Sequence, residues 1–249
     1  TYTIAVAGKG GTGKTTLSGL VVRYLAKHKQ GPILAVDADP NANLNESLGL
    51  TVDQTIGGVC EELREQAGEM SAGLPKETYI EYRIQQVLVE SEDYDLLVMG
   101  RPEGPGCYCY ANTLVRRYVD ILAKNYKYIV MDNEAGLEHL SRRTTQDVDI
   151  MFVLSDTTRK GIWTAGRINA LVDELKLRVK KRYLIINRLE NGLPPSLSEE
   201  IGKQNLELLG TVPSDEMVVE YEITGKPVVD LPDNSKAVEA VEEIMGKLI

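Results

Sequence analysis

The chain has 249 residues, of which 43% are hydrophobic, and a formal net charge of −9 at pH 7. This length fits one α/β domain with a sizeable core, and no apolar run is long enough to span a bilayer. The acidic balance argues against nonspecific binding to nucleic acid or to an anionic membrane. Three cysteines cannot form a disulfide framework, and the first residues lack a secretory pattern. We therefore expect a reducing, cytoplasmic location.

Short apolar runs alternate with helical patterns along the chain. The apolar runs are hydrophobic at nearly every position, which is typical of strands that are covered on both faces. This alternation predicts an α/β fold with a mostly parallel central sheet and helices on both of its faces. Residues 1–249 are expected to form a single domain with a helical insertion at 44–93. Strands are predicted at 2–7, 32–37, 94–100, 126–132, 149–156 and 182–188, and helices at 14–28, 112–125, 138–147, 161–175 and 233–248.

Residues 8–15, GKGGTGKT, match the phosphate-binding pattern G-x-x-x-x-G-K-[ST] between a predicted strand and a predicted helix. The glycines let the loop bend so that backbone N–H groups point at a phosphate, and the helix N-terminus adds its positive end. We expect Lys14 at the β- and γ-phosphates, Thr15 on Mg²⁺ and Thr16 at the α-phosphate. The sequence therefore predicts a P-loop NTPase. Its predicted nucleotide-binding residues in this loop are Gly8, Lys9, Gly10, Gly11, Thr12, Gly13, Lys14, Thr15 and Thr16.

A second lysine, Lys9, follows the first glycine of this loop. Taken alone, it could be a solvated loop residue. Its position resembles that of the signature lysine in the deviant Walker A ATPases, a class that includes MinD, ParA and the nitrogenase iron protein. The resemblance implies a homodimer in which Lys9 reaches the partner's phosphates. A cation placed there would stabilise the charge that develops during phosphoryl transfer, so Lys9 and Lys14 are both predicted catalytic residues.

Two acidic motifs follow predicted strands. VDADP (36–40) resembles the switch I segment of this class, which implies that Asp39 acts on the attacking water and that Asp37 supports the Mg²⁺ shell. IVMDNEAG (129–136) resembles a Walker B strand followed by switch II, which implies that Asp132 holds a Mg²⁺-bound water. Each aspartate alone could be a helix cap or a turn residue. Together they lie beyond the carboxyl ends of strands, where open α/β sheets bind their ligands.

Base recognition is predicted near the end of the chain. In this class an asparagine after a strand often contacts adenine, and Asn187 in IINR (185–188) holds that position. VPSDE (212–216) resembles the segment that closes over the base, with Pro213 fixing the turn. A guanine-recognition motif would need an aspartate where this chain has Glu190. We therefore expect ATP rather than GTP.

Two of the three cysteines lie one residue apart, in the predicted loop 101–112. In an extended segment, Cys107 and Cys109 point the same way and supply two thiolates. The same pair from a two-fold-related partner would complete a four-thiolate site suited to Zn²⁺ or Ni²⁺, with an iron–sulfur cluster also open. Otherwise the two residues are small packing groups. Cys60 is expected to be a packing residue, and the two histidines, His28 and His139, are expected to be structural or exposed.

Four stretches taken together extend the resemblance to the whole chain: GKGGTGKTT, VDADP, GCYCYAN and DNEAGLEHLSRRTT. They resemble the CooC/AcsF family of nickel-insertion ATPases. The resemblance implies a cytoplasmic homodimer that uses ATP/ADP and Mg²⁺, with Cys107 and Cys109 as ligands of one Ni²⁺ or Zn²⁺ shared between subunits. It also implies a metallochaperone role toward carbon monoxide dehydrogenase or acetyl-CoA synthase. The metal and the client enzyme both stay open at this point.

Three other functions would use the same nucleotide site. A MinD- or ParA-like positioning ATPase would need a membrane-binding tail or a basic DNA face, whereas the amphipathic segment 233–249 has more acid than base on its polar side. An electron carrier like the nitrogenase iron protein would take its cysteines from separated segments. A cobyrinic-acid amidating enzyme would need a glutaminase domain, for which this chain is too short. We expect neither nucleic acid nor membrane as a partner.

Overall fold

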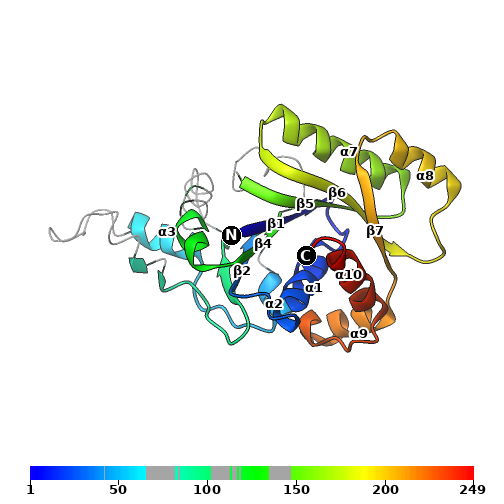
Figure 1. Cartoon of the computed structure of the whole chain (residues 1–249). Helices are drawn as coiled ribbons and strands as arrows, with labels where there is room; N and C mark the ends of the chain where they lie inside the picture. Colours follow the sequence, from blue (N-terminus) through cyan, green and yellow to red (C-terminus); the bar gives the residue numbers. More distant parts are fainter. Residues whose placement is uncertain are drawn as a thin grey trace.

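The central feature of the computed structural model is one parallel sheet with the strand order β3-β2-β4-β1-β5-β6-β7 (Figure 1). The structure describes residues 1–41, 43–65, 82–83, 85–101, 113, 117, 119–134 and 147–249. Every strand pair within this sheet is parallel. The strands are β1 (Tyr2–Gly8), β2 (Ile33–Ala38), β3 (Asp95–Val98), β4 (Tyr128–Asn133), β5 (Asp147–Ser155), β6 (Arg178–Leu189) and β7 (Glu207–Pro213).

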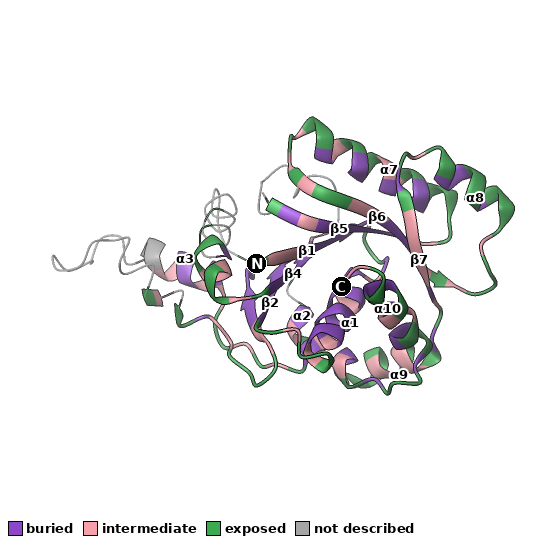
Figure 2. Cartoon of the chain, viewed as in Figure 1, coloured by how far each residue is buried: buried purple, intermediate pink, exposed green. Residues whose placement is uncertain are grey.

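Helices cover both faces of this sheet and bury two separate hydrophobic clusters against it. One cluster lies under α1, α2 and α10, and the other lies under α3, α7 and α8 (Figures 1 and 2). This arrangement explains why β1, β2 and β4 are buried along almost their whole length. The helices are α1 (Lys14–Lys27), α2 (Leu44–Leu48), α3 (Ile56–Glu65), α7 (Arg159–Glu174), α8 (Pro195–Gly202), α9 (Glu216–Thr224) and α10 (Lys236–Gly246), with short 3₁₀ turns η2 (Ala123–Asn125) and η3 (Val228–Asp230).

The predicted parallel α/β fold is confirmed, and the six predicted strands are present within a few residues of their expected bounds. A seventh strand, β7, and the helices α8 and α9 were not predicted. β7 is an edge strand, so most of its residues are only partly buried and its sequence, ELLGTVP, lacks a continuous apolar run. Of the predicted helix at 112–125, the described residues 113, 117 and 119–122 are helical, and Ala123–Asn125 form the 3₁₀ turn η2. All of the predicted helix at 138–147 except residue 147 lies outside the described residues, and Asp147 begins β5 instead. In the described part of 44–93, α2 and α3 are helical.

The C-terminal helix α10 packs its apolar side inward. Its buried residues join the cluster that also contains α1 and Val212 of β7. None of the helices in the described ranges is both long and apolar enough to cross a bilayer. The amphipathic pattern at 233–248 therefore reflects packing within the fold, and α10 has no apolar face left over.

Candidate functional site

The phosphate-binding loop connects β1 to α1 in the middle of the sheet. β1 lies between β4 and β5, with β2 and β3 beyond β4 and with β6 and β7 beyond β5. The chain therefore extends the sheet in opposite directions from β1, and open parallel sheets bind their ligands at such a point. Gly11 and Gly13 have φ values of 78° and 89°, a region that favours glycine. At Gly8, an added Cβ would lie 2.6 Å from the backbone oxygen of Leu154. The spacing of glycines in the motif is thus required by this backbone path.

Inside the loop, Thr12 and Lys14 are held in place by burial. The Thr12 hydroxyl donates to the backbone oxygen of Lys9 at 2.7 Å, and Thr12 is only 2% exposed. Lys14 is 8% exposed, and burial lowers its pKa, while nearby carboxylates, of which Asp132 is the strongest, oppose this shift. A partly desolvated ammonium with acidic neighbours is suited to bind phosphate oxygens.

Asp132 lies at the end of β4, beside the start of α1. Its carboxylate accepts hydrogen bonds from the Thr15 hydroxyl at 2.6 Å and from the Ser18 hydroxyl at 3.3 Å. Burial raises its pKa to about 6, although the hydrogen bond from Thr15 and the charge of Lys14 both act to lower it. The Thr15 hydroxyl and the Asp132 carboxylate are the hard oxygen donors that Mg²⁺ prefers. Their geometry fits a Mg²⁺ held by Thr15 with Asp132 next to it.

Asp37 closes the loop that follows β2. Its two carboxylate oxygens accept from the backbone N–H groups of Asp39 at 3.0 Å and Leu44 at 2.9 Å. It is fully buried, and this burial raises its pKa to about 7. The β2–β4 register also places it directly beside Asp132. These bonds close the backbone loop after β2, which is what a turn residue would do. Asp39 is half-buried and is therefore the more accessible of the two carboxylates.

Lys9 extends from the loop toward the end of β5. Its ammonium lies 4.0 Å from a carboxylate oxygen of Asp156, and its side chain is 41% exposed. Asp156 also accepts from the backbone N–H of Thr158, the residue that caps α7. In this structure, therefore, Lys9 pairs with a carboxylate of its own chain.

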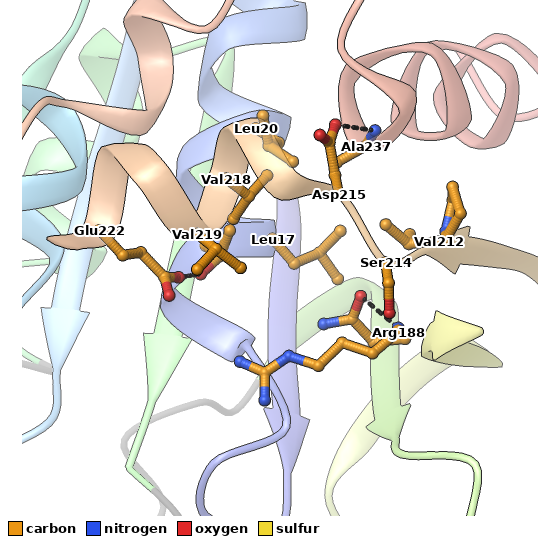
Figure 3. A pocket seen from close by; sticks show the side chains of 13 residues that line it. Leu17, Leu20, Arg188, Val212, Ser214, Asp215, Val218, Val219, Glu222 and Ala237 are labelled. Carbon is orange, nitrogen blue, oxygen red and sulfur yellow. Dashed lines mark hydrogen bonds between the residues drawn. The ribbon is translucent and has the colours of Figure 1, made fainter. Parts of the chain in front are cut away.

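A mostly aliphatic pocket opens next to the phosphate-binding loop (Figure 3). It lies between α1, the end of β6, the end of β7 and α9, and both predicted base-recognition residues, Asn187 and Pro213, line it. Its apolar walls are formed by Leu17, Leu20, Val212, Val218 and Val219. A pocket of this kind beside a phosphate site suits a planar, largely apolar base.

Three polar residues at this pocket have contacts that the sequence did not reveal. The Asn187 amide donates to the backbone oxygen of Thr12 at 2.8 Å, so it clamps the phosphate-binding loop as well as lining the pocket. Arg188 follows it and donates to the backbone oxygen of Gly11 at 3.3 Å. Glu222 accepts from the Thr16 hydroxyl at 2.9 Å. No local motif marks these contacts, because each joins segments that are far apart in sequence.

The predicted metal ligands Cys107 and Cys109 lie outside the described residues, as does His139. Cys60 is buried in the core, as expected for a packing residue. His28 caps the end of α1, and its ring nitrogen lies 2.8 Å from a carboxylate oxygen of Glu242 on α10. Across the part of the chain that the structure describes, no group of three His, Cys, Asp or Glu side chains could hold a metal ion.

Comparison with known proteins agrees with this site. Residues 3–228 match the family model of the CobQ/CobB/MinD/ParA nucleotide binding domain. The chain is 45% identical over 248 residues to an uncharacterized ATP-binding protein of Methanocaldococcus jannaschii, covering 99% of this chain and 98% of the relative. It is 30% identical over 240 residues to the carbon monoxide dehydrogenase accessory protein CooC of Rhodospirillum rubrum, covering 92% and 89%.

Solved structures show the same fold at lower identity. The septum site-determining protein MinD of Pyrococcus horikoshii, complexed with Mg-ADP, superposes with a TM-score of 0.73 at 20% identity over 99% of this chain and 95% of that one. The MinD cell division protein of Aquifex aeolicus gives 0.71 at 22% identity, over 100% and 96%. With its phosphate-binding loop and its matched relatives, the chain belongs to the CobQ/CobB/MinD/ParA family of nucleotide-binding domains and is a P-loop ATPase.

Proposed function

We propose that this ATPase is a metallochaperone of the CooC type. Two copies would form a homodimer that holds one Ni²⁺ or Zn²⁺ as cargo between their Cys107 and Cys109 pairs. The client would be a nickel enzyme, either carbon monoxide dehydrogenase or acetyl-CoA synthase, and the protein would act in the cytoplasm. The similarity to CooC over 92% of this chain and the C-x-C pair in the sequence support this proposal.

The observation that carries the proposal is the connection between β3 and the loop after β2. The cysteine loop is predicted at 101–112, directly after β3. The backbone N–H of Met99 donates to the backbone oxygen of Asp37 at 2.8 Å, and the backbone oxygen of Met99 accepts from Gly57 at 2.7 Å. Met99, which lies two residues before the predicted cysteine loop, is therefore hydrogen-bonded to the segment that carries Asp37 and Asp39. A change at the nucleotide site would reach Met99, from which the chain leads into the predicted cysteine loop.

In the proposed hydrolysis, Lys14 binds the β- and γ-phosphates and Asp39 orients the attacking water. Thr15 would hold Mg²⁺, with Asp132 supporting a Mg²⁺-bound water. The bound Mg²⁺ would neutralise charge on the phosphates. Lys9 would leave Asp156 and reach the partner's phosphates when two subunits close on ATP. Closure on ATP would favour one state of the metal site, and hydrolysis would favour the other.

The metal assignment is tested by replacing both cysteines with Ala and measuring metal per dimer by elemental analysis. The Cys107→Ala, Cys109→Ala variant should lose one Ni²⁺ or Zn²⁺ per dimer and keep its affinity for ATP. Cys60→Ala is the matched control, because Cys60 is a thiol buried in the core, and it should keep the metal. Unchanged metal content in the double variant would refute the assignment.

The dimer assignment is tested by mixing two inactive variants. Lys9→Ala should bind ATP yet hydrolyse it about 10³-fold more slowly, the size of effect seen when an equivalent cation is removed, and Lys14→Ala should fail to bind its phosphates. If Lys9 acts on the partner's nucleotide, the mixture should recover about a quarter of the wild-type rate, since half of the random dimers have one complete site. A mixture without recovered activity would show that Lys9 acts within its own subunit or not at all.

The alternative function is a MinD- or ParA-like positioning ATPase, or an iron-protein-like ATP-driven electron carrier. The fold likeness to MinD supports the first, whereas the buried apolar side of α10 leaves this helix without a face for lipid. Co-sedimentation with anionic liposomes and with duplex DNA, each in the presence of ATP, distinguishes a positioning ATPase. Visible absorption by protein purified without oxygen would identify an iron–sulfur electron carrier.

A further inference from the structure

Arg188 has a backbone conformation that calls for an explanation. Its φ is 57°, in the left-handed region that costs a side chain other than glycine about 1–2 kcal/mol. Among the described residues, the other non-glycine positions with positive φ are Lys29, Lys176 and Asn205. Those three follow the ends of α1, α7 and α8, where helices commonly finish in this conformation. Arg188 lies instead within strand β6.

The conformation of Arg188 comes from a bulge in the sheet. Asn187 pairs with Val212 and Leu189 pairs with Pro213, with a register shift between the two pairs that leaves Arg188 out of the ladder. Its backbone N–H donates to the Asn187 side chain at 2.9 Å. Bulges of this kind redirect a side chain next to a functional site. Here the bulge turns one residue out of the sheet at the mouth of the base pocket.

The Arg188 side chain runs along the edge of this pocket toward the phosphate-binding loop (Figure 3). One guanidinium nitrogen donates to the backbone oxygen of Gly11 at 3.3 Å. Among the described residues this is the one hydrogen bond that the guanidinium donates, so its remaining N–H groups and its planar face can contact a ligand. The pocket walls are aliphatic on the α1 and α9 sides, and Arg188 is the cationic residue among those that line it.

We propose that Arg188 is a nucleotide-binding residue whose guanidinium covers the outward face of the adenine ring while it stays bonded to Gly11. A planar guanidinium stacks well on an aromatic face, and an adenine in this pocket would otherwise have aliphatic contacts on one side and solvent on the other. The bond to Gly11 links occupation of the base pocket to the conformation of the phosphate-binding loop. This inference rests on the proposed base pocket and is independent of the cysteine site.

The test compares three ligands by calorimetry on the full chain: MgATP, MgADP and magnesium tripolyphosphate, which has phosphates but no base. Arg188→Ala should weaken MgATP and MgADP equally, by about 10-fold, as expected for loss of one cation–π contact. Binding of tripolyphosphate should weaken much less, because this ligand loses only the effect of the Gly11 bond on the loop and has no base to lose. Arg178→Ala is the matched control, because Arg178 is an exposed arginine at the opposite end of the same strand, and it should bind all three ligands as the wild type does.

A second variant separates failure of this inference from failure of the base pocket. Val219 lines the pocket and is 54% exposed, so Val219→Trp can fill the pocket without disturbing the core. If Val219→Trp weakens MgATP and Arg188→Ala does not, the pocket binds the base but Arg188 does not contact it. If neither variant changes MgATP binding, the base lies elsewhere and both assignments fail. Equal loss of tripolyphosphate binding in Arg188→Ala would place its effect on the phosphates and overturn the inference.

Discussion

Asp215 joins the base pocket to the C-terminal helix, and its removal should destabilise this part of the fold. The residue caps α9 by accepting from the backbone N–H of Met217 at 2.9 Å. It also accepts from the Ser235 hydroxyl at 2.6 Å and from the backbone N–H of Ala237 at 3.0 Å (Figure 3), both at the start of α10. One carboxylate that is 8% exposed therefore organises the N-termini of two helices.

The expected loss follows from these bonds. A lost N-cap costs about 1 kcal/mol, and hydrogen bonds to a charged group contribute about 1.5–3 kcal/mol each. Because such terms are not additive, we expect about 3–4 kcal/mol of unfolding free energy to be lost in Asp215→Ala. Asp215→Asn keeps one oxygen acceptor and should lose about half as much. In a chain of this size, the Ala variant should melt about 6–12 °C lower.

The effect should also depend on pH. Burial alone would raise the pKa of Asp215, but the hydrogen bonds from Ser235, Ala237 and Met217 outweigh it, so its pKa is lowered in the folded protein. A carboxyl with a lowered folded pKa adds stability above its unfolded pKa of about 3.9 and loses it as the pH falls through the folded value. The difference between wild type and Asp215→Ala should therefore be constant near neutral pH and shrink below about pH 4.

The assay is urea unfolding followed by circular dichroism, at neutral pH and at pH 3.5. Asp233→Ala is the control. Asp233 is another aspartate with close partners, in its case the cations of Arg23 and Lys27, but its side chain is 68% exposed. Its removal should change stability much less and in a salt-dependent way. A loss below about 1 kcal/mol in Asp215→Ala, or a loss equal at both pH values, would refute the assignment of Asp215 as the organising carboxylate.

Two further predictions concern glycines. In Gly13→Ala the new Cβ would lie 2.4 Å from the Asn187 amide nitrogen, so Asn187 must move and lose its hydrogen bond to the loop. In Gly11→Ala the new Cβ meets no atom within 4 Å, so this change adds only backbone strain. Titration with MgATP should show about a 10-fold loss for Gly11→Ala and a much larger one for Gly13→Ala, and equal losses would contradict this. Gly100, at φ 65°, would place a Cβ 2.3 Å from the Thr55 hydroxyl, so Gly100→Ala should lower the melting temperature. Adding Thr55→Gly should recover part of that loss, and no recovery would mean that backbone strain alone is responsible.

The chemistry of the phosphate site could be predicted from short contiguous stretches. The spacing of Gly8, Gly13, Lys14 and Thr15 encodes a loop whose bends, donors and helix start are all local, so the sequence identifies it without knowledge of the fold. The strands could be predicted for a similar reason, because burial on both faces requires an apolar residue at nearly every position. Asn187, which the sequence predicts as a base contact, lines the pocket beside the phosphate-binding loop, although its bond to Thr12 was not predicted.

The tertiary structure decided the rest of the site. Asp37 lies near the end of β2 and Asp39 directly after it, yet Asp37 is fully buried and closes a backbone loop while Asp39 is half-buried. The contacts of Arg188 with Gly11 and of Glu222 with Thr16 join residues that are 177 and 206 positions apart. A local pattern specifies dihedral angles and hydrogen bonds between near neighbours. Contacts over such separations exist only after the strands have taken their order. Only the folded chain therefore reveals the pocket beside the phosphate-binding loop and the residues that connect the two.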